Sequence, residues 1–152
     1  MFSIIIPTFN NLKYLKLCLK SINKNSKYPH EIIIHVNEGS DGTLAYLKDK
    51  NFTFSYSEKN KGVCFAFNEA VRKSTKKYVV LAHDDMYFCP GWDVIFKKEL
   101  DNNINHKDFF LSGTMVQPFQ SYINLDCGKS IEDFDENKLL TELPKINYDD
   151  FQ

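Results

Sequence analysis

The sequence lacks the features that mark several large classes of protein. Acidic and basic residues nearly balance, with a formal net charge of -1, so there is no basic footprint for nucleic acid. No apolar run is long enough to span a membrane, and no charged region precedes an apolar one at the N-terminus as in a secretory signal. We therefore expect a cytoplasmic protein, or one peripheral to a membrane through parts outside this sequence, with no nucleic-acid partner and no membrane segment.

The cysteines also lack a pattern that would mark a disulfide framework or a metal site. Cys18, Cys64, Cys89 and Cys127 are widely spaced and form no CxxC pair. A free cysteine behaves as a small hydrophobic side chain when it is buried. We expect reduced thiols, and for Cys64 and Cys89 in particular we expect a packing role.

What the chain does contain is an alternation of strand and helix patterns without internal repeats. Short apolar runs predict strands, and apolar residues at helical spacing predict helices between them. The strands are expected at 2–7, 31–36, 52–56, 78–82 and 109–116, and the helices at 12–22, 44–47, 63–71 and from Trp92. This order predicts an α/β fold whose mainly parallel sheet is flanked by helices.

Details of these elements can also be predicted. The run at 78–82 is apolar throughout, so we expect a strand buried on both faces. Asn10 or Asn11 is expected to cap the first helix, and Ser40 or Asp41 the second. The strand–helix pattern ends near residue 116, so 1–116 is the predicted core domain. Residues 117–152 are acidic, contain one short helix pattern, and are either a tail around the sheet edge or the start of a truncated acceptor-side region.

Three polar loops follow predicted parallel strands, at 7–11, 37–43 and 83–87. Loops at the carboxyl ends of parallel strands meet at one edge of the sheet, where ligands bind. The third loop carries Asp84 and Asp85 directly after a buried strand, which is unfavourable unless solvent, a cation or a ligand compensates the charge. A hard cation takes one or two carboxylates plus substrate phosphates. These loops favour a divalent-metal and phosphate site, with a solvated acidic turn as the alternative.

Four segments resemble the successive motifs of family-2 glycosyltransferases with the GT-A fold, which is Rossmann-like. They are SIIIPTFNN at 3–11, NEGSDGT at 37–43, NKGVCFAFN at 60–68 and HDDMYFCPGW at 83–92. They occur in the family's order over about the first 116 residues. The resemblance implies that 1–116 binds a nucleotide sugar, and that the nucleoside lies against Pro7, Thr8 and Phe9.

The same resemblance implies roles for residues of the other three motifs. The loop at 37–43 receives the base, through Asn37, Glu38, Gly39 and Ser40. Further donor-binding residues are Gly62 and Asn68 from the third motif and Asp84 from the fourth. Asp85 takes the metal-binding position of the family's DxD motif, with His83 beside it, and the implied cofactor is Mn²⁺ or Mg²⁺.

The chain departs from the family pattern at several positions. Asn37 and Glu38 replace the usual pair of aspartates, and an asparagine amide offers a donor as well as an acceptor, which leaves the base preference open. Phe67 stands where the family commonly has arginine. His83 replaces the first acidic residue of the DxD motif, and because imidazole prefers borderline metals, the identity of the metal and the need for it stay open.

Several residues have two interpretations. His83 is either a metal ligand or a structural histidine, and Lys59 and Lys61 either meet the diphosphate or are solvated. Tyr87, Phe88 and Trp92 form either a platform for the sugar or part of the core. The catalytic base is unknown. The carboxylates available by composition are Asp133, Asp135, Asp149 and Asp150, and none lies in a context that matches the family motif.

The resemblance implies an inverting glycosyltransferase that moves a hexose-type sugar from a nucleoside-diphosphate donor to an acceptor hydroxyl on a glycan or another molecule. The alternative is a nucleotide-sugar-binding module with weak or no catalysis, as a fragment of a larger protein. A nucleotidyltransferase on a similar sheet is disfavoured, because the loop after the first strand is PTFNN rather than a glycine-rich, basic phosphate loop.

Overall fold

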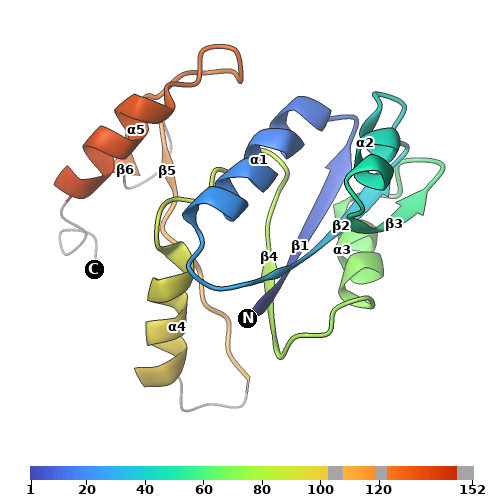
Figure 1. The fold of residues 1–152 in the computed structure, drawn as a ribbon, viewed down its shortest axis with the longest axis horizontal. Coiled ribbons are helices and arrows are strands. Elements are labelled where there is room, and N and C mark those ends of the chain that lie inside the picture. The colour runs from blue at the N-terminus through green and yellow to red at the C-terminus, as the bar shows by residue number, and fades with distance from the viewer. Residues whose placement is uncertain (103–107, 119–122, 147–152) are drawn as a thin grey trace. The chain divides into compact units, whose positions relative to one another are not determined.

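The computed structural model describes residues 1–102, 108–118 and 123–146, and it divides into two compact units, 1–102 and 103–152 (Figure 1). We describe each unit separately. The predicted core of 1–116 extends beyond the first unit, and its boundary stays a prediction. None of the helices in the described part of the chain has the length and apolar character needed to cross a lipid bilayer.

The first unit contains a parallel sheet of four strands in the order β3-β2-β1-β4. The strands are β1 (Phe2–Phe9), β2 (Glu31–Asn37), β3 (Thr53–Ser57) and β4 (Tyr78–Leu81). The predicted parallel sheet is therefore confirmed. β1 runs past its predicted end, since Pro7, Thr8 and Phe9 still pair with β2. Backbone groups of alternate strand residues face the same neighbouring strand, and Ile5 faces β4 because its carbonyl accepts from Ala82 N. Pro7 faces the same side, beyond the end of β4, so the N–H that proline lacks is not needed there.

Helices cover both faces of this sheet, as Figure 1 shows. They are α1 (Leu12–Asn25), α2 (Thr43–Asp49), α3 (Val63–Val71) and α4 (Trp92–Asn102). Side chains of β1 alternate between the faces. Ile4 and Ile6 pack in the larger core cluster with α1, whereas Ile5 packs in a smaller cluster with α3. Burying each of these isoleucines stabilises the fold by about 1.5–3 kcal/mol.

The prediction that the 78–82 strand is buried on both faces is wrong. Tyr78 and Val80 pack against the larger core cluster, but Val79 and Leu81 are 40% and 51% exposed. The reason is topological: β4 is the last strand in the order of this sheet, and α3 packs over β1 and β2. A local apolar run does not reveal which strand lies at the edge.

The second unit contains a two-stranded parallel ladder of β5 (Val116–Gln117) and β6 (Ile123–Asn124), followed by α5 (Glu136–Glu142) and η1 (Leu143–Lys145). The short helix predicted in the acidic segment is confirmed. The strand predicted at 109–116 is wrong, since only its last residue is in a strand. Residues 109–115 have no ladder partner in the described part of the chain, and Phe110 is 88% exposed.

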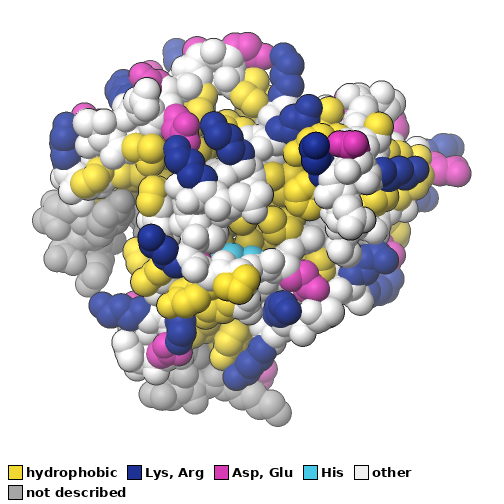
Figure 2. Space-filling view, in the orientation of Figure 1, with side chains coloured by type: hydrophobic (Ala, Val, Ile, Leu, Met, Phe, Trp, Pro, Cys, Tyr) yellow, Lys and Arg dark blue, Asp and Glu magenta, His cyan; other side chains and the backbone are white. Residues whose placement is uncertain are grey.

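The surface carries charges of both signs. Figure 2 shows Lys and Arg side chains scattered over the visible face, with Asp and Glu between them rather than one basic patch. This distribution agrees with the near-neutral net charge of the sequence.

Candidate functional site

The three polar loops meet at one cleft in the first unit, at the carboxyl end of the sheet. The cleft has a volume of about 250 Å³. It is lined by Pro7, Thr8, Phe9, Asn11, Asn37, Asn60, Gly62, Val63, His83 and Asp84. The prediction that these loops share one edge of the sheet is confirmed. No lysine or arginine is among the described residues that line the cleft.

Asp84 links the loop after β4 to the end of β1. Its Oδ2 accepts a hydrogen bond from Thr8 Oγ1 at 2.6 Å, and its Oδ1 accepts one from Asn11 Nδ2 at 3.1 Å. Burial raises the pKa of Asp84, and the charge of Asp85 adds to this, while the two hydrogen bonds act in the opposite direction. Both carboxylate oxygens accept hydrogen bonds from the protein, so Asp84 joins the loop after β4 to the end of β1 and the start of α1.

Asp85 and His83 are both exposed. The side chain of Asp85 has no bonding partner among the described residues, so its carboxylate is available to a cation. The His83 ring lies edge-on to Phe67, with 5.8 Å between ring centroids. The described residues contain no group of three His, Cys, Asp or Glu side chains that would hold a metal alone. A cation at Asp85 therefore fits only as one shared with a ligand.

Asn37, which is 3% exposed, uses its oxygen within the protein. Oδ1 accepts from Lys61 N and from Ser57 Oγ, both at 3.0 Å. Because a backbone N–H only donates, the Lys61 contact fixes which amide atom is the oxygen. The amide nitrogen has no partner in the part of the chain that the structure describes. Asn37 therefore has a donor, not an acceptor, to offer a ligand.

The rest of the second loop is tied to the first. Glu38 Oε1 accepts from Asn10 Nδ2 at 3.1 Å and from Ser40 Oγ at 3.0 Å, and Asn10 Oδ1 accepts from Ser40 N at 2.9 Å. Gly39 has φ +72, and a Cβ there would lie 2.7 Å from Val36 Cγ1, so glycine is required. Glu38, Gly39 and Ser40 shape the rim but do not line the cleft.

The helix starts beside the cleft differ from the prediction. Leu12 N, at the start of α1, donates to Asp41 Oδ2 at 2.8 Å, and neither Asn10 nor Asn11 caps this helix with its side chain. The expectation of an asparagine cap is wrong, because Asn11 bonds to Asp84 instead. Asp41 also accepts from Thr43 N at the start of α2. One carboxylate therefore holds two helix starts together.

Only the first half of the third motif, which spans 60–68, lines the cleft. Asn60 Oδ1 accepts from Gly62 N at 2.8 Å, and this turn places Asn60, Gly62 and Val63 along the cleft. Asn68 is exposed on α3 and does not line the cleft. Sequence reasoning missed Asn11, Asn60 and Val63 as lining residues. The N-x-G turn before α3 was the available signal for Asn60.

The aromatic residues of the fourth motif belong mainly to the core. Phe88 and Trp92 pack against the larger cluster, with 4.8 Å between their ring centroids, which favours the core interpretation over a sugar platform. Tyr87 is half-buried, and its hydroxyl accepts from Asn25 Nδ2. The packing role predicted for Cys64 is wrong, because the thiol is exposed on α3.

Two of the carboxylates considered for a catalytic base lie in the second unit. Asp133 accepts from Ser130 Oγ and from the N–H groups of Lys129 and Ser130, and these bonds lower its pKa to about 2. Asp135 caps α5 by accepting from Lys138 N. Both serve local structure, and a carboxylate of such low pKa is a poor base. Asp149 and Asp150 lie outside the described residues.

Comparison with known proteins identifies the family. Residues 3–115 match glycosyl transferase family 2. The chain is 30% identical over 121 residues to an uncharacterized glycosyltransferase, YwdF, of Bacillus subtilis, covering 78% of this chain and 43% of YwdF. The chain thus spans less than half the length of this curated relative.

Solved structures show the same fold. S. aureus TarS 1-349 in complex with UDP aligns with a TM-score of 0.59 at 22% identity, over 73% of this chain and 38% of TarS. The mannosyltransferase PcManGT from Pyrobaculum calidifontis, in complex with GDP-Man and Mn²⁺, aligns with a TM-score of 0.51 at 23% identity, over 62% of this chain and 30% of PcManGT. Together with the family match, the parallel sheet and the cleft at its carboxyl edge lead to one conclusion: this chain belongs to glycosyl transferase family 2 and has the GT-A fold.

Proposed function

We propose that this chain is the donor-binding part of an inverting glycosyltransferase, which moves a hexose-type sugar from a nucleoside diphosphate to an acceptor hydroxyl. The observation that carries the proposal is the arrangement at the rim. Asp84 is held by β1 and the start of α1, and the next residue, Asp85, is exposed and unpaired among the described residues beside a cleft. This is the arrangement that a charged two-phosphate donor needs.

A divalent cation fits this site on chemical grounds. The described cleft lining has no lysine or arginine to balance the charge of a diphosphate. The negative charges of Asp84 and Asp85 would also repel the diphosphate. Mn²⁺ or Mg²⁺ held by Asp85, with His83 adjacent and phosphate oxygens as further ligands, would supply that balance and stabilise the departing diphosphate. UDP in TarS and GDP-Man with Mn²⁺ in PcManGT are ligands of the same type.

The protein groups have distinct tasks in this proposal. Pro7, Thr8 and Phe9 border the nucleoside, and the Asn37 amide donates a hydrogen bond to an acceptor atom of the base. Thr8 and Asn11 hold Asp84, which keeps the loop of Asp85 beside the cleft. Apart from Asp84, no carboxylate lines the cleft among the described residues. The base that deprotonates the acceptor then comes from an acceptor-side region.

Calorimetric binding of UDP and GDP, with and without Mn²⁺, tests the proposal. We expect binding that depends on Mn²⁺ and that Asp85→Asn removes, since the amide lacks the charge that holds the cation. Asp49→Asn, an exposed carboxylate on α2 away from the cleft, is the control and should bind normally. Equal binding by unaltered chain and Asp85→Asn would contradict the metal site. Release of sugar from a donor in the presence of acceptors distinguishes transfer from binding alone.

A further inference from the structure

The loop that presents Asp85 is held at its first half by the rim, but its second half depends on different groups. Residues 83–91, between β4 and α4, form no helix or strand, and the last ladder bond before them is the one from Ala82 N to Ile5 O. Thr8 and Asn11 hold this loop only at Asp84. The direction of the Asp85 side chain therefore also depends on what holds the chain after it.

The end of α1 holds the second half of the loop. Ser21 Oγ accepts from Phe88 N at 2.9 Å, Asn25 Nδ2 donates to Phe88 O at 2.7 Å, and Asn25 O accepts from Gly91 N at 3.0 Å. Ser21 and Asn25 are 1% and 7% exposed, on the face of α1 that otherwise carries apolar side chains. Polar groups are unfavourable at such positions unless they are hydrogen-bonded, and here the loop backbone supplies the partners.

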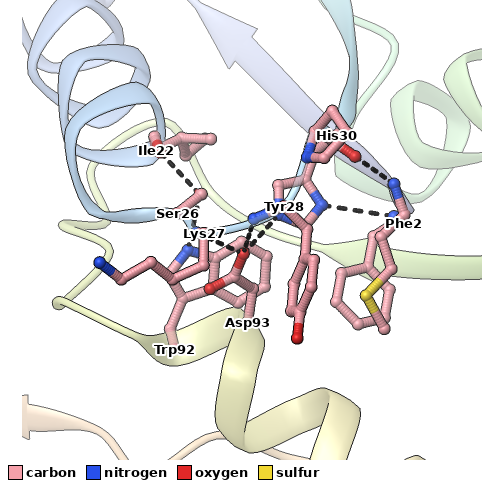
Figure 3. A network of polar contacts seen from close by, with 10 residues as sticks. Phe2, Ile22, Ser26, Lys27, Tyr28, His30, Trp92 and Asp93 are labelled. Atoms are coloured by element: carbon pink, nitrogen blue, oxygen red, sulfur yellow. Dashed lines mark hydrogen bonds and ion pairs between the residues drawn. The ribbon is translucent and has the colours of Figure 1, made fainter.

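Asp93, in the first turn of α4, is bonded to the segment that follows α1, as Figure 3 shows. Its Oδ2 accepts three hydrogen bonds, from Lys27 N and Tyr28 N at 2.8 Å and from His30 Nε2 at 3.0 Å. The side chain is fully buried, and Oδ1 has no partner among the described residues. Trp92 Nε1 donates to Ser26 Oγ at 3.1 Å beside it.

The donors to Asp93 are neutral. His30 Nδ1 accepts from Phe2 N at 3.3 Å, so the ring proton is on Nε2 and the imidazole is uncharged. Burial by itself would raise the pKa of Asp93, but the bonds from Tyr28, His30 and Lys27 outweigh it and lower the pKa. A buried carboxylate with neutral donors and one unpaired oxygen is a costly way to join two segments. Its result is a fixed geometry between residues 27–30, which follow α1, and the start of α4.

We propose that Ser21, Asn25 and Asp93 form a clamp that positions the 83–91 loop, so that the carboxylate of Asp85 points at the diphosphate. The clamp residues do not line the cleft, and they act through the loop as positioning residues. This inference rests on the proposed function of Asp85. It adds a requirement that the four family motifs do not contain, because all three clamp residues lie outside the ranges 3–11, 37–43, 60–68 and 83–92.

The test compares two ligands that use different parts of the site. Asn25→Ala should weaken Mn²⁺-dependent binding of the nucleoside diphosphate about tenfold or more, as is typical when groups that orient metal ligands are removed. Metal-free binding of the nucleoside alone, which uses 7–9 and Asn37, should stay unchanged. General destabilisation does not produce this split. Asn23→Ala, an exposed asparagine on the same helix, is the matched control and should leave both affinities unchanged.

Trp92 reports on the clamp directly, because it is the single tryptophan of the chain. Asn25→Ala should shift its fluorescence emission to longer wavelength, as the ring gains water contact, and Asn23→Ala should not. Ser21→Ala removes one bond to the loop backbone and provides the same comparison if Asn25→Ala does not fold. Asp93→Asn keeps an acceptor for the three donors and should retain more Mn²⁺-dependent affinity than Asp93→Ala.

The outcomes separate the two proposals. If the unaltered chain binds no diphosphate with Mn²⁺, the proposed function fails, and the positioning role fails with it. If the unaltered chain binds, and both Asn25→Ala and Ser21→Ala bind equally well, the clamp is overturned while the proposed function stands. Equal loss of nucleoside and diphosphate binding would also overturn it, because the effect would then be structural.

Discussion

The amino and carboxyl ends of the parallel sheet differ in whether key polar side chains have hydrogen-bond partners. At the amino end, Glu31 accepts from Ser3 Oγ at 2.5 Å, and from Thr75 N and Thr75 Oγ1 at 2.9 Å each, while Ser3 Oγ accepts from Lys76 N. At the carboxyl end, Asp85 and the amide nitrogen of Asn37 have no partner among the described residues. Polar groups that bond to one another stabilise the fold, whereas groups left available at a cleft can bind a ligand.

Substitution of Asp85 is expected to have the largest effect on binding. Asp85→Ala should abolish Mn²⁺-dependent binding of a nucleoside diphosphate, because the cation loses its protein carboxylate. Its stability should change by less than about 0.5 kcal/mol, since the side chain is exposed and makes no contact that folding needs. Calorimetry and chemical denaturation of the same preparation measure both quantities. If Asp85→Ala lost stability but kept its binding, Asp85 would act in folding rather than in ligand binding, which contradicts this prediction.

Substitution of Asn37 is expected to change the choice of base. Asn37→Asp keeps an oxygen for Lys61 N and Ser57 Oγ but replaces the free donor by an acceptor. An unpaired buried polar group costs about 1–3 kcal/mol, so relative affinities for UDP, CDP, GDP and ADP should change by about fivefold or more. Competition binding measures the ranking. An identical ranking for both proteins would show that this amide does not contact the base.

Substitution of Glu31 tests the amino end. Glu31→Gln should lower the free energy of unfolding by about 1–2 kcal/mol, because charge-assisted hydrogen bonds from Ser3 and Thr75 are lost or weakened. Affinity for the diphosphate should not change. Urea denaturation and calorimetry check both. Weaker binding by a variant of normal stability would mean that the amino end also takes part in the site.

Lower pH is expected to weaken the fold moderately. Burial lowers the pKa of His30, and the N-terminal amine adds to this while the Asp93 bond opposes it; burial also lowers the pKa of His35, against the charge of Glu69. As pH falls, these histidines therefore bind protons at a higher pH in the unfolded chain than in the folded chain. Their contribution to the free energy of unfolding is fully present above pH about 6.5 and is lost below it. Each histidine contributes at most about 1.4 kcal/mol per pH unit. His30→Gln should reduce the slope, and a stability that rises as pH falls would contradict this assignment.

Substitution of Asn68 is expected to have the smallest effect. The side chain is exposed on α3 and does not line the cleft, although the sequence resemblance implies a donor-binding role. Asn68→Ala should leave diphosphate affinity unchanged, whereas truncation of Asn60 should lower it. A clear loss of affinity for Asn68→Ala would extend the site along α3.

The sequence predicted the parts of this molecule that depend on local pattern. The strand–helix alternation and the meeting of three loops follow from apolar runs and from the geometry of parallel sheets. It did not predict the exposed face of β4, because the edge position depends on strand order. It also missed the bond from Leu12 N to Asp41, which joins residues 29 positions apart. The place of Asn11 in the cleft depends on its bond to Asp84, which is equally non-local.

The exposure of Cys64 on α3 also has a practical consequence. Cys18 and Cys127 are buried, Cys89 is half-buried, and burial raises the pKa of Cys18 to about 12, with Asp84 and Asp85 adding to this. A thiol-specific dye will therefore react first at Cys64, next to Val63 at the mouth of the cleft. Cys64 is thus an attachment point for an optical probe that would report on occupancy of the cleft.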